Sequence, residues 1–179
     1  MKFKSVFFVF MRISPENVYN RIIESGGHFL SELKLEQPIL ATEPELVPAF
    51  GYELLREVLL PEILGRETAS ILYWAGKGLA RKYPLESIED MISFFNQAGW
   101  GTLQLKSEKK DELEFELSSP LIADRFKSHP DCHFQLEAGF LAQQIEQQKQ
   151  VITEAYEHPK KRLSIVSFTV RWDRKDTTK

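Results

Sequence analysis

The chain has 179 residues, of which 42% are apolar and 27% are charged, and its net charge is −3. This composition is typical of a soluble globular domain, and it excludes the strongly basic surface that nucleic-acid binding requires. Cys132 is the single cysteine of the sequence, which excludes an intramolecular disulfide and favours a cytoplasmic location. No apolar run reaches the ~20 residues that a membrane-spanning helix needs, so we expect no transmembrane segment.

The first 47 residues are predicted to form an extension outside the main domain. Residues 1–10 combine two lysines with a short apolar run, as a secretory signal does, but no small-residue cleavage site follows. A buried strand and a true start at Met11 are the alternatives. Residues 14–27 favour a short helix, and the prolines and glutamates of residues 34–48 favour an extended linker.

A first helix of the main domain is predicted from residue 50 to residue 60. Its apolar residues recur every three or four positions, as expected for a helix that packs one face on a core. They include Leu54, Leu55, Val58 and Leu59. Pro61 has no N–H group to donate within a helix, so we expect this helix to end near it.

A second helix is predicted over residues 67–81, and it contains two glycines. Gly76 and Gly78 each destabilise a helix by about 1 kcal/mol relative to alanine, so another group should approach this backbone closely. A neighbouring helix and the wall of a ligand pocket are the two explanations.

Two further helices have recognisable start signals. Ser87 should begin a third helix, because Asp90 three residues later can complete a capping box. Ser119 and Pro120 should begin a short helix that ends by His129.

The apolar residues alternate with polar ones over residues 103–117, on both sides of a polar turn. This pattern predicts a hairpin with one face in water, which makes it antiparallel. Residues 163–172 are mostly apolar and should add a strand to the same sheet. The charged residues 174–179 are predicted to be a frayed tail, so the main domain is expected to span residues 48–173.

A long helix is predicted from residue 134 to residue 156, with one apolar face. Its other face carries five glutamines: Gln143, Gln144, Gln147, Gln148 and Gln150. We expect this face to lie in solvent, with an oligomer contact as the alternative.

The segment Ser128–His133 holds the densest group of potentially reactive side chains. His129, Cys132 and His133 could supply three ligands to zinc, but Cys132 and His133 are sequence neighbours that point apart, and no second ligand pair is visible. A nucleophilic Cys132 would need a base beside it, and a buried thiol at the start of a helix is the alternative. Phosphate-binding loops and hydrolase motifs are absent from the sequence. We therefore predict a protein that is not an enzyme, with no catalytic residue, metal or cofactor.

Aromatic residues make up 12% of the chain, and several lie at the ends of predicted elements. Filling of the core accounts for most of them. A cavity lined by phenylalanines and small residues, suited to an apolar ligand, is the alternative.

Three short segments carry a resemblance to a known family: LYWAGK at residues 72–77, AGWG at 98–101 and QLEAGF at 135–140. They are similar to the YslB-like family of uncharacterised bacterial proteins. More distantly, the main domain resembles the ligand-binding superfamily of Golgi transport-particle (TRAPP) subunits, 4-vinyl reductase domains and haem-NO-binding domains. The resemblance implies an α+β fold of the TRAPP-subunit type, with a helical layer packed on a twisted antiparallel sheet, and a dimer formed through helices.

What the resemblance implies for function is binding rather than catalysis. Members of the superfamily hold an apolar ligand, an effector or a haem between helices and sheet, or they serve as assembly scaffolds. The Tyr-x-Ser-x-Arg motif of the haem-binding members is absent, and so are the additional cysteines that suggest a metal in some vinyl-reductase-like members. Cys132, which precedes Gly139 and Phe140, is similar to a cysteine of those members.

These observations together predict a cytoplasmic homodimer that holds an apolar small molecule or lipid between its helices and its sheet. A dimeric scaffold for protein interactions, without a ligand, is the alternative. The predicted pocket residues are Tyr73, Trp74, Gly76, Cys132, Phe134, Gly139 and Phe140.

Overall fold

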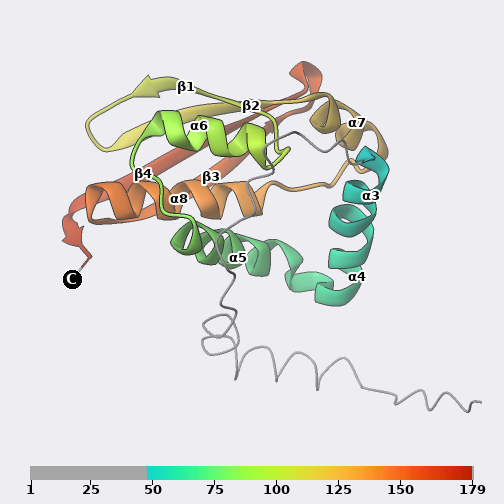
Figure 1. Ribbon diagram of the computed structural model, residues 1–179, viewed down its shortest axis with the longest axis horizontal. Coiled ribbons are helices and arrows are strands. Elements are labelled where there is room, and N and C mark those ends of the chain that lie inside the picture. Colours follow the sequence, from blue (N-terminus) through green and yellow to red (C-terminus); the bar gives the residue numbers. More distant parts are fainter. Residues whose placement is uncertain (1–47, 179) are drawn as a thin grey trace, which may run out of the picture. The chain divides into compact units, whose positions relative to one another are not determined.

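A four-stranded antiparallel sheet carries helices on one of its faces (Figure 1). The computed structural model describes residues 48–178, and the predictions made for residues 1–47 lie outside the described residues. The strands follow the order β1–β2–β4–β3 across the sheet. Their bounds are β1 Thr102–Glu108, β2 Glu112–Ser118, β3 Val151–Lys160 and β4 Ile165–Thr177. The predicted α+β fold is confirmed.

The helices come from three parts of the described chain: before β1, between β2 and β3, and between β3 and β4. The first group is α3 Ala49–Glu53, the π-helical η1 Leu54–Leu59, α4 Leu60–Leu64, the 3-10 turn η2 Gly65–Glu67, α5 Thr68–Lys82 and α6 Ile88–Gln97. The others are α7 Pro120–Ser128, α8 Gln135–Lys149 and the 3-10 turn η3 Lys161–Leu163.

The alternation of apolar and polar residues decides which face of the sheet is buried. Strand β2 pairs with both β1 and β4, so that Leu105 and Phe168 lie on either side of Phe115. Phe115 and Phe168 are fully buried, whereas the neighbouring pair Glu114 and Thr169 is only partly buried and lies on the other face. The predicted hairpin with one wet face, and the strand that follows it, are therefore confirmed.

Helices α6 and α7 begin at the predicted caps. The Ser87 Oγ accepts the backbone N–H of Asp90 at 3.1 Å, and the Asp90 carboxylate accepts the N–H of Ser87 at 3.1 Å, which completes the capping box. The Ser119 Oγ accepts the N–H of Ile122 at 3.2 Å. Gly99 follows α6 with a φ of 69°, a conformation that glycine adopts without strain.

Aromatic rings fill the space between α6, α8 and the sheet. The ring centroids of Phe94, Phe95 and Trp100 lie 4.5, 5.9 and 5.4 Å from the centroid of Phe140. These separations are typical of favourable aromatic pairs. Much of the aromatic content therefore belongs to the hydrophobic core, as the simpler of the two sequence-based explanations holds.

The helix predicted over residues 134–156 is wrong beyond Lys149. Helix α8 ends there, Gln150 adopts a left-handed conformation with φ 56° and ψ 37°, and β3 begins at the next residue. The run Val151–Thr153 is β-branched throughout, which favours a strand over a helix. Burial alternates with a period of two from Val151, which distinguishes this segment from the helix before it.

The glutamines of α8 hold neighbouring elements instead of facing solvent. Gln143 and Gln144 are buried. The Gln144 Nε2 donates to the carbonyl oxygen of Tyr83 at 2.7 Å, and its Oε1 accepts the N–H of Leu85 at 3.1 Å. The Gln148 Nε2 donates to the carbonyl oxygen of Leu85 at 3.1 Å. The prediction of a solvated face is wrong for the buried Gln143 and Gln144. Gln144 and Gln148 satisfy backbone groups of the α5–α6 connection, whereas the Gln143 Nε2 donates to Glu146 Oε1 at 2.9 Å.

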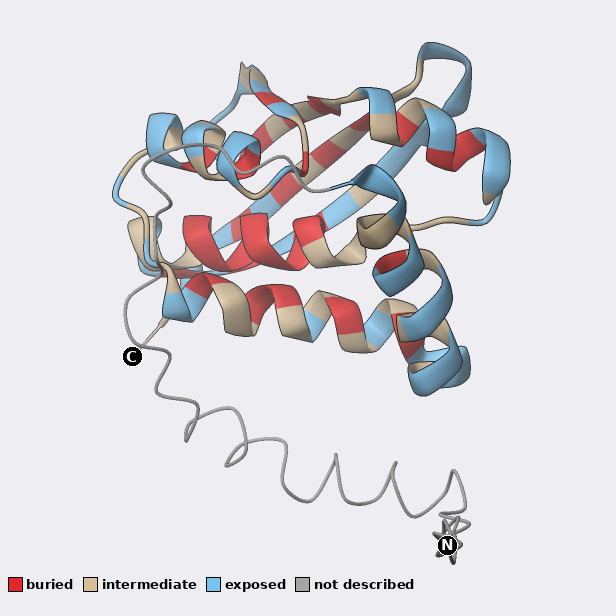
Figure 2. Ribbon diagram, turned by 45° about the vertical axis from the view of Figure 1, so that its right-hand side comes forward, coloured by how far each residue is buried: buried red, intermediate tan, exposed pale blue. Residues whose placement is uncertain are grey.

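The helical segment before α5 differs from its prediction in both orientation and length. It runs from Ala49 to Leu64, and Pro61 lies in the first turn of α4, directly after the altered hydrogen bonding of η1. Its predicted core residues are exposed by 42% to 57%, and the residue that is buried is Arg56. Figure 2 shows this segment mostly in the colour of exposed residues. The prediction that its apolar face packs on the core is therefore wrong.

Strand β4 continues into the segment that was predicted to be a frayed tail. Thr177 pairs with Val151 of β3, and the N–H of Thr178 donates to the carbonyl oxygen of Gln150 at 3.1 Å. Strand β4 thus extends to Thr177, which pairs with β3 again after an irregularity in the register between Trp172 and Thr177.

Candidate functional site

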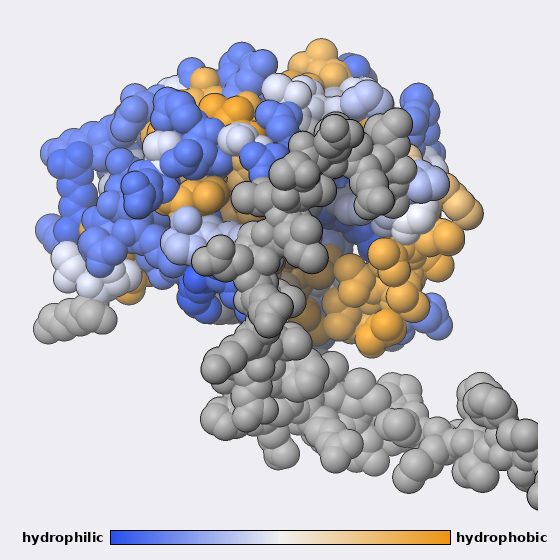
Figure 3. Space-filling view, viewed as in Figure 1, coloured by the Kyte–Doolittle hydropathy of each residue, from blue (hydrophilic) through white to orange (hydrophobic). Residues whose placement is uncertain are grey.

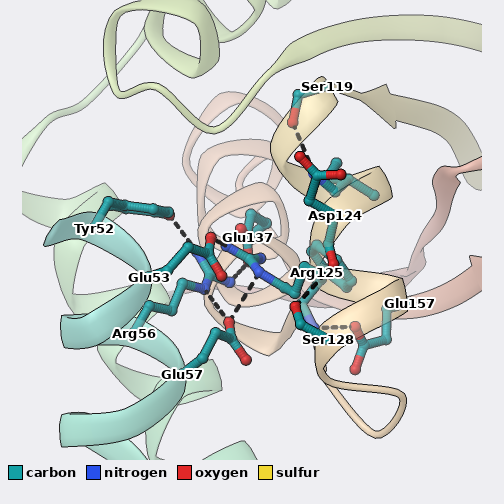
Figure 4. A network of polar contacts seen from close by, with 12 residues as sticks. Tyr52, Glu53, Arg56, Glu57, Ser119, Asp124, Arg125, Ser128, Glu137 and Glu157 are labelled. Carbon is teal, nitrogen blue, oxygen red and sulfur yellow. Dashed lines mark hydrogen bonds and ion pairs between the residues drawn. The ribbon is translucent and has the colours of Figure 1, made fainter. Parts of the chain in front are cut away.

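Two buried arginines meet three glutamates where α3 and η1 approach α7 and α8 (Figure 4). We call Glu53, Arg56, Glu57, Arg125 and Glu137 the arginine cluster. The two arginines are only 6% and 3% exposed. Buried charges are stable only where they are paired, so this cluster fixes the helix before α5 by its polar face.

Each arginine of the cluster forms ion pairs with two glutamates. The Arg56 Nη2 donates to Glu137 Oε2 at 2.6 Å, and its Nε lies 3.6 Å from Glu57 Oε1. The Arg125 Nε lies 2.9 Å from the same Glu57 oxygen, and its Nη2 donates to Glu53 Oε1 at 3.2 Å. The cluster joins segments that are 68 to 84 positions apart in the sequence (57 to 125, and 53 to 137).

An aromatic ring lies beside both guanidinium groups. Arg56 and Arg125 lie 6.0 and 5.2 Å from the centroid of the Phe134 ring, within the range of cation–π attraction. The Arg56 Nη1 also donates to the Tyr52 hydroxyl at 2.9 Å. Phe134, predicted as a pocket residue, is fully buried and supports the arginine cluster.

The cluster holds three carboxylates against two guanidinium groups. Burial opposes the charge of Arg56, but the adjacent Glu137 raises the pKa of Arg56 above its ordinary value. Burial raises the pKa of Glu57, and the nearby Arg125 and Arg56 offset only part of this effect. The raised pKa of Glu57 therefore reflects the energetic cost of burying its charged carboxylate.

A partly buried carboxylate outside the cluster, that of Glu157, contacts the start of α8. The Glu157 carboxylate, from β3, accepts the backbone N–H of Phe134, and it accepts the Gln135 Nε2 at 2.8 Å. An anionic group at a helix N-terminus is favourable because it accepts N–H groups that have no partner within the helix. Burial raises the pKa of Glu157, and the hydrogen bond from Gln135 lowers it.

A cleft of about 420 Å³ opens beside the arginine cluster. Residues 56–72 form one wall, and residues 128–133 form the other. Arg56 and Glu57 belong to both the cleft and the cluster, whereas Pro61 and Leu72 supply apolar surface. A volume of this size lies within the range of small-molecule sites, roughly 300–1,000 Å³.

Cys132 and His133 line the cleft in their uncharged forms. Burial and the nearby Glu57 raise the pKa of the Cys132 thiol to about 11. Burial and the nearby Arg56 lower the pKa of His133, so its imidazole is neutral near pH 7. The His133 Nδ1 is buried and has no hydrogen-bond partner among the described residues. A thiolate–imidazolium pair, which a cysteine nucleophile uses, is disfavoured by both shifts.

The seven predicted pocket residues lie in several different environments. Cys132 lines the cleft, and Phe134 and Phe140 are fully buried in the core. Trp74 is 64% exposed on α5. The role of these residues in ligand binding stays a prediction.

The two predicted glycines lie where α5 crosses α8. A Cβ on Gly76 would lie 2.8 Å from the backbone nitrogen of Phe140, and a Cβ on Gly139 would lie 2.8 Å from the carbonyl carbon of Tyr73. Helix packing therefore accounts for the glycine at position 76. Gly78 has open space where its Cβ would be, and nothing in the described structure explains it.

Two side chains of α5 satisfy the free edge of β3. The N–H of Ala155 donates to the Tyr73 hydroxyl at 3.2 Å. The Lys77 Nζ lies 3.4 Å from the carbonyl oxygen of Thr153 and 3.0 Å from Glu146 of α8. The same glutamate accepts the N–H of Thr153 at 3.2 Å. Tyr73 thus contacts the backbone of an edge strand, where an unpaired N–H group would otherwise remain.

The outer side of the helix before α5 is a continuous apolar surface. Its large side chains form two rows at a spacing of four residues, and each is exposed by 42% to 72%. We call these residues the apolar face: Phe50, Leu54, Val58, Leu55, Leu59 and Ile63. Figure 3 shows hydrophobic residues gathered over α3 and α4. Glu62 is the only charged residue among the nine exposed positions from Pro48 to Leu64.

Neither the arginine cluster nor the orientation of this helix was predicted from the sequence. The signal was present, since Tyr52, Glu53, Arg56 and Glu57 repeat at helical spacing opposite the apolar residues. Such a pattern shows that a helix is amphipathic, and it leaves open which face turns inward. The partners Arg125 and Glu137 lie more than 65 positions away, so spacing alone cannot link them to Arg56.

Neither a metal group nor a membrane helix is found in the part of the chain that the structure describes. Among residues 48–178, no three His, Cys, Asp or Glu side chains are grouped to hold a metal ion. In the same range, no helix is long and apolar enough to cross a membrane.

Comparison with known proteins connects the chain to sequences and to a fold. Residues 49–171 match the family described as "Protein of unknown function (DUF2507)". Over 128 residues the chain is 55% identical to "Uncharacterized protein YslB" from Bacillus subtilis (strain 168), covering 72% of this chain and 86% of that protein. Over 97 residues it is 28% identical to "Uncharacterized protein MJ1642" from Methanocaldococcus jannaschii, covering 53% of this chain and 58% of that protein.

The fold is similar to a solved structure of a vinyl-4-reductase family protein from Methanocaldococcus jannaschii. The TM-score is 0.52 at 18% sequence identity, and the match covers 93% of this chain and 99% of that chain. At this identity the likeness shows the fold alone. The predicted resemblances to the YslB-like family and to 4-vinyl reductase domains are confirmed.

Proposed function

Because the chain belongs to the family described as "Protein of unknown function (DUF2507)", its function has to be argued from its own surface, and we propose that it is a non-enzymatic protein-binding module that assembles as a homodimer. The observation that carries this proposal is the apolar face on the outer side of α3, η1 and α4. In most surface helices the apolar residues face the core, and here the charged residues do.

The apolar face is large for a surface that meets only water. Its six side chains each expose about half of their area, which together amounts to several hundred Å². The largest apolar patch of a typical monomer is roughly 300–600 Å² and often marks an interaction site. Exposed leucines and phenylalanines of this kind are stabilised when a partner removes them from water.

A second copy of the chain is the partner that this surface fits best. Its exposed positions carry one charged residue, Glu62, so nothing on it selects a partner by charge. The helical segment from Ala49 to Leu64 has 16 residues and is about 24 Å long. Two such apolar faces are complementary to each other across a two-fold axis, which is the commonest symmetry of homo-oligomers.

The proposal that the protein is not an enzyme rests on the protonation state of the Cys132 thiol. Its thiol has a pKa of about 11 and stays protonated near pH 7, where a thiol is a weak nucleophile. A single, half-buried thiol also suits a reducing compartment, so the proposal keeps the cytoplasmic location.

Holding an apolar ligand between helices and sheet, our first sequence-based hypothesis, has weaker support. The rings of Phe95, Phe115, Phe140 and Phe168 are fully buried and occupy the space between these layers. A ligand there would have to displace core side chains, at the cost of the packing that they make.

Sedimentation equilibrium of the full chain tests the proposal. We expect a mass of twice 20.8 kDa at micromolar concentration. Leu55→Glu places a charge in the apolar face and should yield a monomer with an unchanged circular dichroism spectrum. Ile152→Glu is the matched control, because Ile152 is similarly exposed (52% against 57%) but lies on the sheet; it should leave the dimer intact.

Two results would contradict a homodimer that forms through the apolar face. One is a wild-type chain that sediments as a monomer at about 50 µM, well above the micromolar affinity common for interfaces of standard size. The other is a dimer that Ile152→Glu dissociates and Leu55→Glu does not. That result would show that the interface lies on the sheet.

A further inference from the structure

The cleft offers hydrogen-bond acceptors that no residue from 48 to 178 uses. Glu57 directs one oxygen, Oε1, at both arginines of the cluster, and its Oε2 makes no ion pair or hydrogen bond there. The carboxylate of Asp131, which is exposed at the rim, is equally without a described partner. The His133 Nδ1 is buried and unpaired, as described above, and it accepts a hydrogen bond in the tautomer that carries its proton on Nε2. A ligand of this cleft therefore gains most by donating hydrogen bonds.

The cationic groups of the cleft are not free to receive an anion. The guanidinium of Arg56 is occupied by Tyr52, Glu137 and Glu57. Arg125, behind the wall, is occupied by Glu53 and Glu57. An anion entering the cleft would have to break one of these buried pairs or lie against carboxylates, and both cost free energy.

The balance of charge around the cleft is negative. The arginine cluster has three carboxylates and two guanidinium groups, and Asp131 adds another carboxylate. The Lys161 ammonium donates to the carbonyl oxygen of Pro130 at the rim and contributes one positive charge to this balance. One negative charge remains in excess. Burial already raises the pKa of Glu57, which indicates that its charge is incompletely compensated.

The remaining wall of the cleft is apolar. Pro61 and Leu72 line one side, and Pro130 lines the other. A bare metal ion would gain nothing from this surface, and the described residues group no three metal-type ligands. An organic molecule with an apolar body would cover it and remove it from water.

We infer that this cleft binds a small organic cation, whose N–H groups donate to Glu57 and Asp131 and whose apolar body lies against Pro61 and Leu72. Both the acceptors and the apolar surface are needed for this assignment, since carboxylates alone would attract any cation. The site lies in one chain and uses none of the six residues of the apolar face, so it does not depend on the homodimer.

Three small molecules of the same shape and different charge test the ligand class. Benzamidinium is a cation, benzamide is neutral and benzoate is an anion. Each is titrated to about 20 mM into the ¹⁵N-labelled full chain, because at the efficiency per atom that is typical of drug-sized ligands a molecule of this size binds with a dissociation constant of about 10 mM. We expect saturable amide shifts for residues 128–133 and 65–72 with benzamidinium, weaker shifts with benzamide and none with benzoate.

A pair of matched variants tests the location. Asp131→Asn removes a rim carboxylate from an exposed position, so it should fold normally and weaken benzamidinium binding roughly three-fold. Asp124→Asn removes an exposed carboxylate of α7 that does not line the cleft, and it should leave the affinity unchanged. The inference is overturned if benzamidinium causes no saturable shift, if benzoate binds as well, or if both variants bind benzamidinium like the wild type.

Discussion

Arg56 and Glu137 form a buried ion pair of 2.6 Å although they are 81 positions apart in the sequence. The pair joins η1 to the first turn of α8, so it determines which side of the first described helix faces inward. Because the charged side of this helix faces the interior of the protein, its apolar side faces outward. The surface that we propose for dimerisation is thus a consequence of an ion pair on the opposite side of the same helix.

Removing one partner of this pair should be strongly destabilising. Glu137→Leu leaves the Arg56 guanidinium buried without its closest counter-charge, and we expect a loss of about 3–5 kcal/mol in the free energy of unfolding. Urea unfolding followed by tryptophan fluorescence measures the change. The double variant Arg56→Met/Glu137→Leu should recover most of the loss, since it removes the unpaired charge as well. A single variant that loses less than about 1 kcal/mol would show that the pair is not structurally important.

Gly139 and Gly78 should respond to alanine in opposite directions. A methyl group on Gly139 would collide with the backbone of Tyr73, which cannot move without separating α5 from α8. We expect Gly139→Ala to destabilise the fold by about 2 kcal/mol or more. Gly78→Ala enters open space in a helix and should stabilise the chain by about 0.5–1 kcal/mol. Thermal unfolding of both variants makes the comparison, and a destabilising Gly78→Ala would mean that a further group packs against α5.

The raised pKa of Cys132 has a chemical consequence. With a pKa of about 11, only about one thiol in a thousand is ionised at pH 8, whereas an unfolded chain has a thiol pKa near 8.5. Alkylation of the native chain by iodoacetamide at pH 8 should therefore be on the order of 100-fold slower than in urea. Intact-mass spectrometry measures both rates, and equal rates would refute the shift.

The same thiol makes the folded state sensitive to alkali. Because the folded chain holds this proton more tightly than the unfolded chain, stability is unaffected below about pH 8.5. It should decrease as the pH rises from there towards 11, the folded pKa. Cys132→Ser removes the titrating group, so the variant should lose less stability over this interval than the wild type does.

Tyr73→Phe should expose a defect at the edge of the sheet. The variant removes the hydroxyl that accepts the N–H of Ala155, and a half-buried N–H group is left without its partner. We expect a loss of about 1 kcal/mol in the free energy of unfolding. Tyr83→Phe is the control, because the Tyr83 hydroxyl makes no hydrogen bond within residues 48–178, and it should change little. Similar losses from both variants would assign the effect to ring packing.

Local signals in the sequence were sufficient for much of the sheet and for two helix starts. The hairpin β1–β2 follows from alternation of period two, the capping box at Ser87 from residues three positions apart, and the cap at Ser119 from the proline that follows it. These features depend on neighbours in the chain, so the sequence contains all the information that they need.

The wrong predictions concern contacts between distant segments. The burial of Gln144 depends on backbone groups of Tyr83 and Leu85, about 60 positions earlier, and the inward turn of Arg56 depends on Glu137. The end of α8 was missed for another reason: one glutamine and two glutamates, Gln150, Glu154 and Glu157, continue past Lys149 at helical spacing, and they masked the β-branched run from Val151. The cleft unites segments 56–72 and 128–133 and could not be located before the fold was known.

The occupied edge of β3 limits how copies of this protein can join. The N–H and carbonyl groups of Thr153 and the N–H of Ala155 are already bonded by side chains of α5 and α8, so an incoming strand cannot pair with these three groups. A strand from another chain is therefore blocked from extending the sheet at these positions. Such extension is how open edges lead to fibres. The homodimer that we propose uses a helix surface instead, and two copies that meet there about a two-fold axis leave no free surface of this kind for a third.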